Sequence, residues 1–123
     1  MAVKYRILVA DDEDSFREIL NSQLTKAGYE VHLAADGEEA ITCLGEKKID
    51  VVLLDIRMPK VSGIQVLKYV SQNCPATKAI MLTGFADLEL AMEAKQYGAV
   101  DFINKPFSLD DVISSVQQAV KRS

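Results

Sequence analysis

VVLLDIRMP (residues 51–59) is the most informative stretch of this sequence, because four apolar residues run without interruption into Asp55. A run that is apolar on both faces is typical of a central strand in a parallel sheet covered by helices on both sides. ILVADDE (7–13) has the same form, with apolar residues followed by acidic ones. Together the two stretches predict an α/β protein whose central strands end in charged side chains.

Three more short apolar runs, at residues 29–34, 78–83 and 100–104, are rich in Val, Ile, Leu or aromatic residues and have the length of strands. The segments between the five runs carry apolar residues at helical spacing. The chain is therefore predicted to alternate strand and helix five times. Short loops and right-handed crossovers favour a doubly wound α/β sandwich, although periodicity leaves the order of its strands open.

Capping residues predict where the helices begin and end. Two pairs have the spacing of capping boxes, Asp36 with Glu39 and Ser62 with Gln65. Gly45 is predicted to end the helix that Asp36 begins. The fourth helix has only Asp87 as a candidate cap, so its first turn is expected to be less well stabilised than the others.

Composition limits the class of protein. The 123 residues are 49% hydrophobic and 26% charged, which fits one domain over residues 1–123 and excludes a disordered chain. No apolar run is long enough to cross a membrane, and the net charge of -4 argues against direct nucleic-acid binding. Cys43 and Cys74 lack metal-ligand spacing and are expected to be reduced thiols, which predicts a cytoplasmic location.

Polar side chains follow four of the five predicted strands. Since parallel strands of such a sandwich end at one edge of the sheet, these side chains are expected to form a single pocket there. The pocket residues predicted in this way are Asp11, Asp12, Asp55, Thr83, Gly84, Asn104 and Lys105.

The chemistry of this pocket points to phosphoryl transfer. Three neighbouring carboxylates repel one another, and a hard cation such as Mg²⁺ relieves the repulsion through oxygen ligands. Together with the Lys105 ammonium, the cation neutralises the charge on phosphoryl oxygens. An aspartate is then the natural nucleophile and forms an aspartyl-phosphate.

Taken in order, these motifs resemble the receiver domain of bacterial two-component response regulators. The resemblance runs from about Arg6 to Val120. Besides the two stretches quoted first, it rests on Gly63, on MLTGFAD (81–87) and on GAVDFINKPF (98–107). It implies a flavodoxin-like (βα)5 fold with strand order 2-1-3-4-5. It also implies a receiver domain that either stands alone or is cut from a longer regulator.

The resemblance assigns the reactive centre residue by residue. Asp55 matches the phosphoacceptor. Asp11 and Asp12 match the acidic pair that holds Mg²⁺, with Asp12 and Asp55 as direct ligands and Asp11 acting through water. The backbone carbonyl of Arg57 completes the metal shell.

Further positions match the groups that respond to phosphorylation. Thr83 and the adjacent Gly84 match the phosphoryl-binding switch, and Lys105 matches the lysine that pairs with the phosphoryl group. Phe102 occupies the aromatic switch position, where many relatives have tyrosine. The family also has a cis bond before the proline that follows the lysine, here Pro106.

Two side chains are expected to set the lifetime of the phosphorylated state. In the family the residues two after the phosphoacceptor and two after the threonine flank the approach of the hydrolytic water. Here they are Arg57 and Phe85, and neither offers a carboxamide or carboxylate to orient that water. Slow autodephosphorylation is therefore expected.

The implied function is a phosphorylation-activated switch that turns over no external substrate. A sensor histidine kinase or a phosphotransfer protein supplies the phosphoryl group. An output domain, an effector or a second copy of the chain is expected on the face formed by the fourth helix, fifth strand and fifth helix. Residues 83–107 look most like receivers of the enhancer-binding, ATPase-coupled transcription regulators.

Three other classes of protein share parts of this pattern. A haloacid dehalogenase type phosphatase needs a second Asp two residues after the nucleophile, where this chain has Arg57. A flavodoxin needs an uncharged phosphate loop where this chain has DDED (11–14), which would repel a flavin phosphate. A structural module whose pocket is never phosphorylated stays open, and only a phosphodonor assay distinguishes it.

Overall fold

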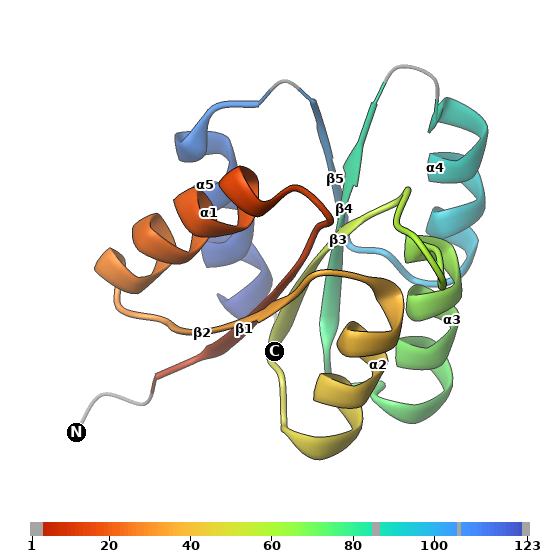
Figure 1. Ribbon diagram of the computed structural model, residues 1–123, viewed down its shortest axis with the longest axis horizontal. Coiled ribbons are helices and arrows are strands. Elements are labelled where there is room, and N and C mark those ends of the chain that lie inside the picture. Colours follow the sequence, from red (N-terminus) through yellow and green to blue (C-terminus); the bar gives the residue numbers. More distant parts are fainter. Residues whose placement is uncertain (1–3, 85–86, 106, 122–123) are drawn as a thin grey trace.

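The computed structural model describes residues 4–84, 87–105 and 107–121. Strands and helices alternate strictly along the chain (Figure 1). Their bounds are β1 (Arg6–Ala10), α1 (Asp14–Lys26), β2 (Glu30–Ala34), α2 (Gly37–Glu46), β3 (Val51–Asp55), α3 (Gly63–Asn73), β4 (Lys78–Thr83), α4 (Leu88–Gln96), β5 (Asp101–Asn104) and α5 (Leu109–Lys121). None of these helices is both long enough and apolar enough to span a membrane, within the ranges described.

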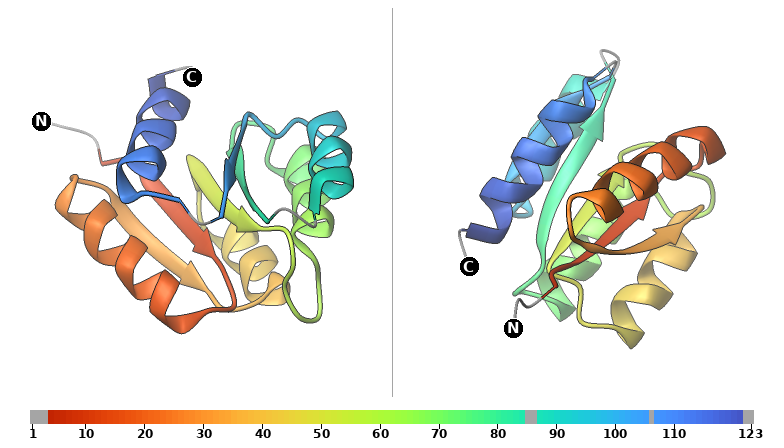
Figure 2. Two further views of the ribbon diagram at one scale, coloured as in Figure 1. Left: turned by 90° about the horizontal axis from the view of Figure 1, so that it is seen from above. Right: turned by 90° about the vertical axis from the view of Figure 1, so that its left-hand side faces the viewer.

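The strands form one parallel sheet in the order β2-β1-β3-β4-β5, which confirms the expected flavodoxin-like topology. Helices α1 and α5 cover one face of the sheet, and α2, α3 and α4 cover the other (Figures 1 and 2). Asp55, at the end of β3, is paired in register with Leu82 of β4. Thr83, the next residue of β4, is paired with Asn104 of β5. The ends of the central strands therefore lie level at one edge, called the carboxyl edge below.

Strand β3 shows why its sequence is continuously apolar. Val52 and Leu54 pack into the core beneath α2, α3 and α4. Val51 and Leu53 pack into the core beneath α1 and α5. All four side chains are fully buried, so no position on the strand is available for a polar residue before Asp55.

The helix caps agree with the sequence patterns in part. Ser62 and Gln65 form the predicted capping box at the start of α3. At α2 the Asp36 side chain accepts from the backbone N–H of Glu39, but the Glu39 carboxylate accepts from the N–H of Ala35, so this is not a reciprocal box. The prediction that Gly45 ends α2 is wrong, because the helix continues to Glu46. Packing against neighbouring helices outweighs the small helical penalty of one glycine.

Gly63 connects the fold to the carboxyl edge. A Cβ atom at this position would lie 2.2 Å from the carbonyl oxygen of Asp55 and 2.8 Å from the Cα of Ile56. Both neighbours are backbone atoms of the strand end, which cannot move without moving Asp55. The first turn of α3 is therefore packed directly against the backbone of Asp55, and only glycine allows this approach.

Gly63→Ala is expected to lower the free energy of unfolding by about 1–3 kcal/mol, because the methyl group must displace backbone. Gly45→Ala is the matched control, since a Cβ there meets only the Tyr69 hydroxyl at 3.2 Å and alanine favours the helix. Urea denaturation followed by circular dichroism measures both. Equal stability of the two variants would contradict the close packing at Gly63.

Candidate functional site

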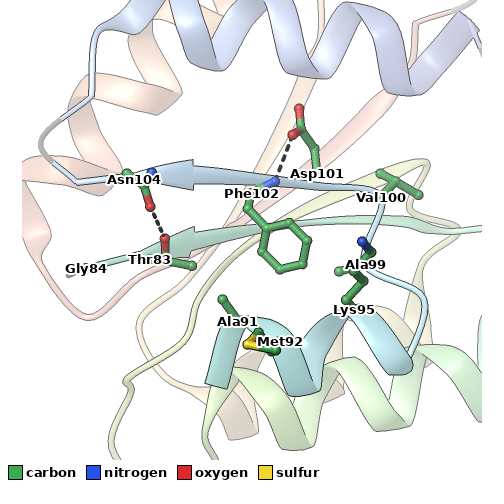
Figure 3. A pocket seen from close by; sticks show the side chains of 10 residues that line it. All are labelled: Thr83, Gly84, Ala91, Met92, Lys95, Ala99, Val100, Asp101, Phe102 and Asn104. Carbon is green, nitrogen blue, oxygen red and sulfur yellow. Dashed lines mark hydrogen bonds between the residues drawn. The ribbon is translucent and has the colours of Figure 1, made fainter. Parts of the chain in front are cut away.

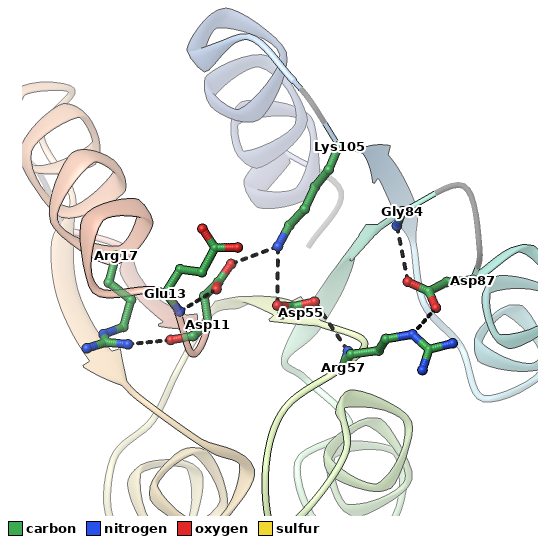
Figure 4. A network of polar contacts seen from close by, with 8 residues as sticks. All are labelled: Asp11, Glu13, Arg17, Asp55, Arg57, Gly84, Asp87 and Lys105. Carbon is green, nitrogen blue, oxygen red and sulfur yellow. Dashed lines mark hydrogen bonds and ion pairs between the residues drawn. The ribbon is translucent and has the colours of Figure 1, made fainter.

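The predicted pocket residues from three separate strands meet at the carboxyl edge (Figure 4). The Nζ of Lys105 lies 3.3 Å from Oδ2 of Asp11 and 3.2 Å from Oδ2 of Asp55. Asp11 directly follows β1, and Asp55 is the last residue of the adjacent strand β3. Lys105 directly follows β5, at the edge of the sheet. One ammonium group thus bridges two carboxylates that are distant in sequence.

Asp12 joins these two carboxylates in an acidic cluster. One oxygen from each of Asp11, Asp12 and Asp55 lies within 4.8 Å of the others. Asp11 and Asp55 are buried, whereas Asp12 is exposed, so the cluster reaches solvent through Asp12. A set of carboxylate oxygens at this spacing could hold a hard divalent cation.

The negative charge of the three carboxylates is only partly compensated by the protein. Burial, with the Asp11 charge as a second cause, raises the pKa of Asp55 from 3.8 to about 6, and Lys105 offsets only part of this rise. Burial opposes charge on Lys105, but the Asp55 and Asp11 carboxylates outweigh it and raise the pKa of that ammonium. The ionised Asp55 therefore gains from any additional positive charge placed beside it.

Backbone groups fix the orientation of both buried carboxylates. The N–H of Glu13 donates to Oδ1 of Asp11 at 2.9 Å, and the N–H of Arg57 donates to Oδ1 of Asp55 at 3.2 Å. Each carboxylate thus faces the N–H two residues further along, as in an Asx turn. The second oxygen of each is left to face Lys105.

Lys105 is held by contacts of both its side chain and its backbone. Its Nζ lies 5.2 Å from the ring centroid of Phe16 on α1, a cation–π contact. Its backbone N–H donates to the carbonyl of Thr83 at 2.6 Å, which joins the ends of β4 and β5. The Phe16 ring packs in turn against Phe107, with centroids 5.2 Å apart.

Thr83 is not bonded to Asp55 within the part of the chain that the structure describes. Its hydroxyl donates to Oδ1 of Asn104 on the neighbouring strand at 2.8 Å, and the residue is buried (Figure 3). The structure therefore brings Asp11, Asp12, Asp55 and Lys105 together and keeps the Thr83 hydroxyl engaged with β5.

Phe102 lies at an apolar groove between α4 and β5, called the α4–β5 groove (Figure 3). Its ring extends from β5 toward α4, and the groove has a volume of about 660 Å³. Thr83 and Gly84 line one end of the groove, so it adjoins the pocket at the carboxyl edge. Met92 also lines it and is 66% exposed, so α4 presents apolar surface to solvent here.

One contact was missed by sequence reasoning, which considered Asp87 only as a helix cap. The Asp87 carboxylate accepts from Nε of Arg57 through one oxygen, and from the N–H of Gly84 at 3.3 Å through the other (Figure 4). Opposite charges at these positions are the only sequence signal, and they lie 30 residues apart.

Two of the predicted site residues, Phe85 and Pro106, lie outside the described residues. The expected roles of Phe85 in the phosphoryl lifetime and of Pro106 as a cis-proline therefore stay predictions.

Comparison with known proteins gives a consistent family. The sequence profile of the response regulator receiver domain matches residues 7–117. The regulatory protein AtoC of Escherichia coli is 40% identical over 94% of this chain and 25% of its own length. The DNA-binding transcriptional regulator NtrC of Salmonella typhimurium is 37% identical over 93% of this chain and 24% of its own length. The chain spans about a quarter of the length of these relatives.

Solved structures agree with this result. The receiver domain of NtrX from Brucella abortus superposes with a TM-score of 0.89 at 31% identity, covering 95% of this chain and 99% of that one. A CheY-like receiver domain protein from Methanospirillum hungatei superposes with a TM-score of 0.94 at 28% identity, covering 98% of this chain and 96% of that one.

Asp55→Asn is expected to stabilise the metal-free protein, because it removes a charge whose burial raises the pKa to about 6. The expected gain at pH 7 is roughly 1–3 kcal/mol in the free energy of unfolding. The folded state binds the Asp55 proton more tightly than the unfolded state, so wild-type stability should fall as pH rises from about 4 to about 6. Thermal melts in chelator across this range measure the effect.

Asp12→Asn provides the control within the same cluster. Its carboxylate is exposed to solvent, so the metal-free melting temperature should change little. Adding a divalent cation should raise the melting temperature of wild type more than that of either variant. A wild type destabilised by the cation would contradict the assignment of the cluster as a cation site.

Proposed function

Because this chain belongs to the response regulator receiver domain family, we propose that it is a signalling switch that accepts a phosphoryl group on Asp55. The observation that carries the proposal is the Lys105 ammonium, placed 3.2 Å from Asp55 beside two further carboxylates. An ammonium here can pair with a phosphoryl oxygen once Asp55 has reacted. The buried position of Asp55 excludes water from most of the reacting carboxylate.

The transfer step is a substitution at phosphorus. A carboxylate oxygen of Asp55 forms the new P–O bond. The P–N bond of a donor phosphohistidine breaks, and its electron pair leaves on the imidazole nitrogen. Lys105 balances the charge that Asp55 gains, while the N–H of Arg57 keeps the carboxylate oriented during attack.

The residues of the acidic cluster fit Mg²⁺. Asp12 and Asp55 would bind the ion directly, Asp11 through water, and the Arg57 carbonyl would complete the shell. Hard oxygen ligands and the excess negative charge of the cluster support this choice. When bound, Mg²⁺ supplies positive charge that neutralises the phosphoryl oxygens.

The output of the switch follows from the end of β4. Thr83 would exchange its bond to Asn104 for one to the phosphoryl group, and Gly84 would donate its backbone N–H. Both residues line the α4–β5 groove with Phe102, so the exchange would change this surface. The groove and the exposed Met92 support an effector, an output domain or a second copy of the chain as the occupant.

The phosphodonor in this proposal is a sensor histidine kinase or a phosphotransfer protein. The chain would accelerate its own phosphorylation and dephosphorylation and turn over no external substrate. The names of the relatives, a regulatory protein and a DNA-binding transcriptional regulator, support a role in transcription control through parts that this chain does not cover. Free Cys43 and Cys74 and a kinase donor support a cytoplasmic location.

Acetyl phosphate with Mg²⁺ is expected to add one phosphoryl group to the wild type, and Asp55→Asn should abolish the addition. In this assay the P–O bond to the acetyl group breaks, and acetate leaves with the electron pair. Intact-protein mass spectrometry measures the product. Asp110→Asn, an exposed change on α5, is the control and should label as wild type does. Mg²⁺-dependent labelling of Asp55→Asn at the wild-type level would falsify the assignment.

The phosphorylated state is expected to be long-lived. Arg57→Asn and Phe85→Ala, singly and together, should shorten its half-life, by about tenfold for the pair, because they open the approach and Asn can orient a water. Loss of phosphate after removal of the donor is timed by mass spectrometry. Arg6→Asn, at the opposite end of β1, is the matched control. An unchanged half-life in the double variant would show that these side chains do not set it.

A further inference from the structure

The Asp87 carboxylate is placed unlike an ordinary helix cap. Asp87 is the N-cap residue of α4, yet its side chain makes no capping hydrogen bond to the described residues of that helix. It is only 6% exposed and faces back toward the carboxyl edge, where it accepts from Arg57 and Gly84 (Figure 4). A buried carboxylate that leaves its own helix uncapped needs another explanation.

Both donors that Asp87 uses lie next to the reactive centre. Gly84 follows Thr83, and it lies two residues beyond Leu82, the register partner of Asp55 on the neighbouring strand. Arg57 follows Asp55 by two residues, and its own N–H is bonded to the Asp55 carboxylate. A backbone N–H and a guanidinium are thus held at the rim of the pocket by one carboxylate.

A phosphoryl group on Asp55 would require donors of this kind. It carries close to two negative charges and three strong acceptor oxygens. A guanidinium binds carboxylate and phosphoryl oxygens through the same fork of N–H groups. The donors that border Asp55 on the β4 side are therefore engaged by an anion of the protein itself before any phosphoryl group arrives.

We propose that Asp87 is an internal competitor of the phosphoryl group, occupying Arg57 and the Gly84 N–H until phosphorylation displaces it. The inference rests on the proposed phosphorylation of Asp55. The Arg57 side chain is 66% exposed, so water can solvate the guanidinium when Asp87 leaves it, and the pair is worth less than a fully buried one. The contact is therefore weak enough for a doubly charged group to replace.

Displacement of Asp87 would also reach the output surface. Asp87 directly precedes α4, whose residues Ala91, Met92 and Lys95 line the α4–β5 groove. Once released from Gly84 and Arg57, the carboxylate is free to cap the first turn of α4. The same group would thus hold the end of β4 in the resting state and stabilise the start of α4 in the phosphorylated state.

Asp87→Asn tests the competitor, with Glu89→Gln as the matched control because it removes the same charge from the first turn of α4 without a contact to either donor. The rate of phosphoryl uptake from acetyl phosphate with Mg²⁺ is measured by intact mass, and the Gly84 amide resonance is recorded without phosphodonor. Asp87→Asn should take up the phosphoryl group about fivefold faster or more, since Arg57 and the Gly84 N–H are already released from the carboxylate. Its Gly84 resonance should lie shifted toward the phosphorylated wild-type position.

The outcomes separate the two proposals. No uptake by wild type overturns the proposed function itself. Normal uptake by wild type, with Asp87→Asn no faster than Glu89→Gln and its Gly84 resonance unshifted, overturns the competitor and leaves the function standing. Slower uptake by Asp87→Asn also overturns it. Asp87→Ser, which can cap α4, is the second variant if Asn lowers the melting temperature, and it should behave as Asp87→Asn does.

Discussion

The ion pair that joins Lys105 to both Asp11 and Asp55 is the interaction on which the arrangement of the site depends. The two carboxylates are buried and repel one another, and the ammonium that binds both offsets part of that repulsion. The strand order makes the pair possible, because β1 and β3 are neighbours and their ends are level. Lys105 follows β5, beyond β4, and its long side chain reaches Asp55 across the end of β4. A different order of the same strands would separate these groups.

One ammonium does not fully compensate the acidic cluster, and this imbalance links stability to function. The raised pKa of Asp55 shows that the folded protein disfavours its ionised form. Residues chosen for stability alone would not place this charge in a buried position. Under the proposed function, the same unfavourable charge would attract a cation, and the Asp55 carboxylate would be the nucleophile. Gly63 packs tightly against the Asp55 backbone and keeps it fixed. The strand end therefore cannot move to relieve the unfavourable charge of Asp55.

The sequence predicted those features that depend on local sequence patterns or on rules common to all parallel sheets. The apolar run before Asp55 predicted a central strand, and the shared edge of parallel strands predicted that Asp11, Asp55 and Lys105 would meet. Strand order was beyond periodicity, since every order buries the same apolar faces, and it came from the resemblance to receiver domains. The partner of Asp87 could not be predicted either. An acidic residue directly before a helix is a typical N-cap. Asp87 binds Arg57 instead because packing places the loop between β3 and α3 beside it.

The end of β4 is held by two hydrogen bonds, and under the proposed function both would be exchanged after a single modification. The Thr83 hydroxyl donates to Asn104, and the Gly84 N–H donates to Asp87. Buried donors cost free energy when they lose their acceptors, so a usable switch must satisfy them in both of its states. Under the proposed function, phosphoryl oxygens would replace Asn104 and Asp87 as acceptors. Thr83 and Gly84 would then donate the same number of hydrogen bonds in both states. The two states would then differ mainly in charge beside Asp55. Such a near balance lets a single phosphoryl group shift the population from one state to the other.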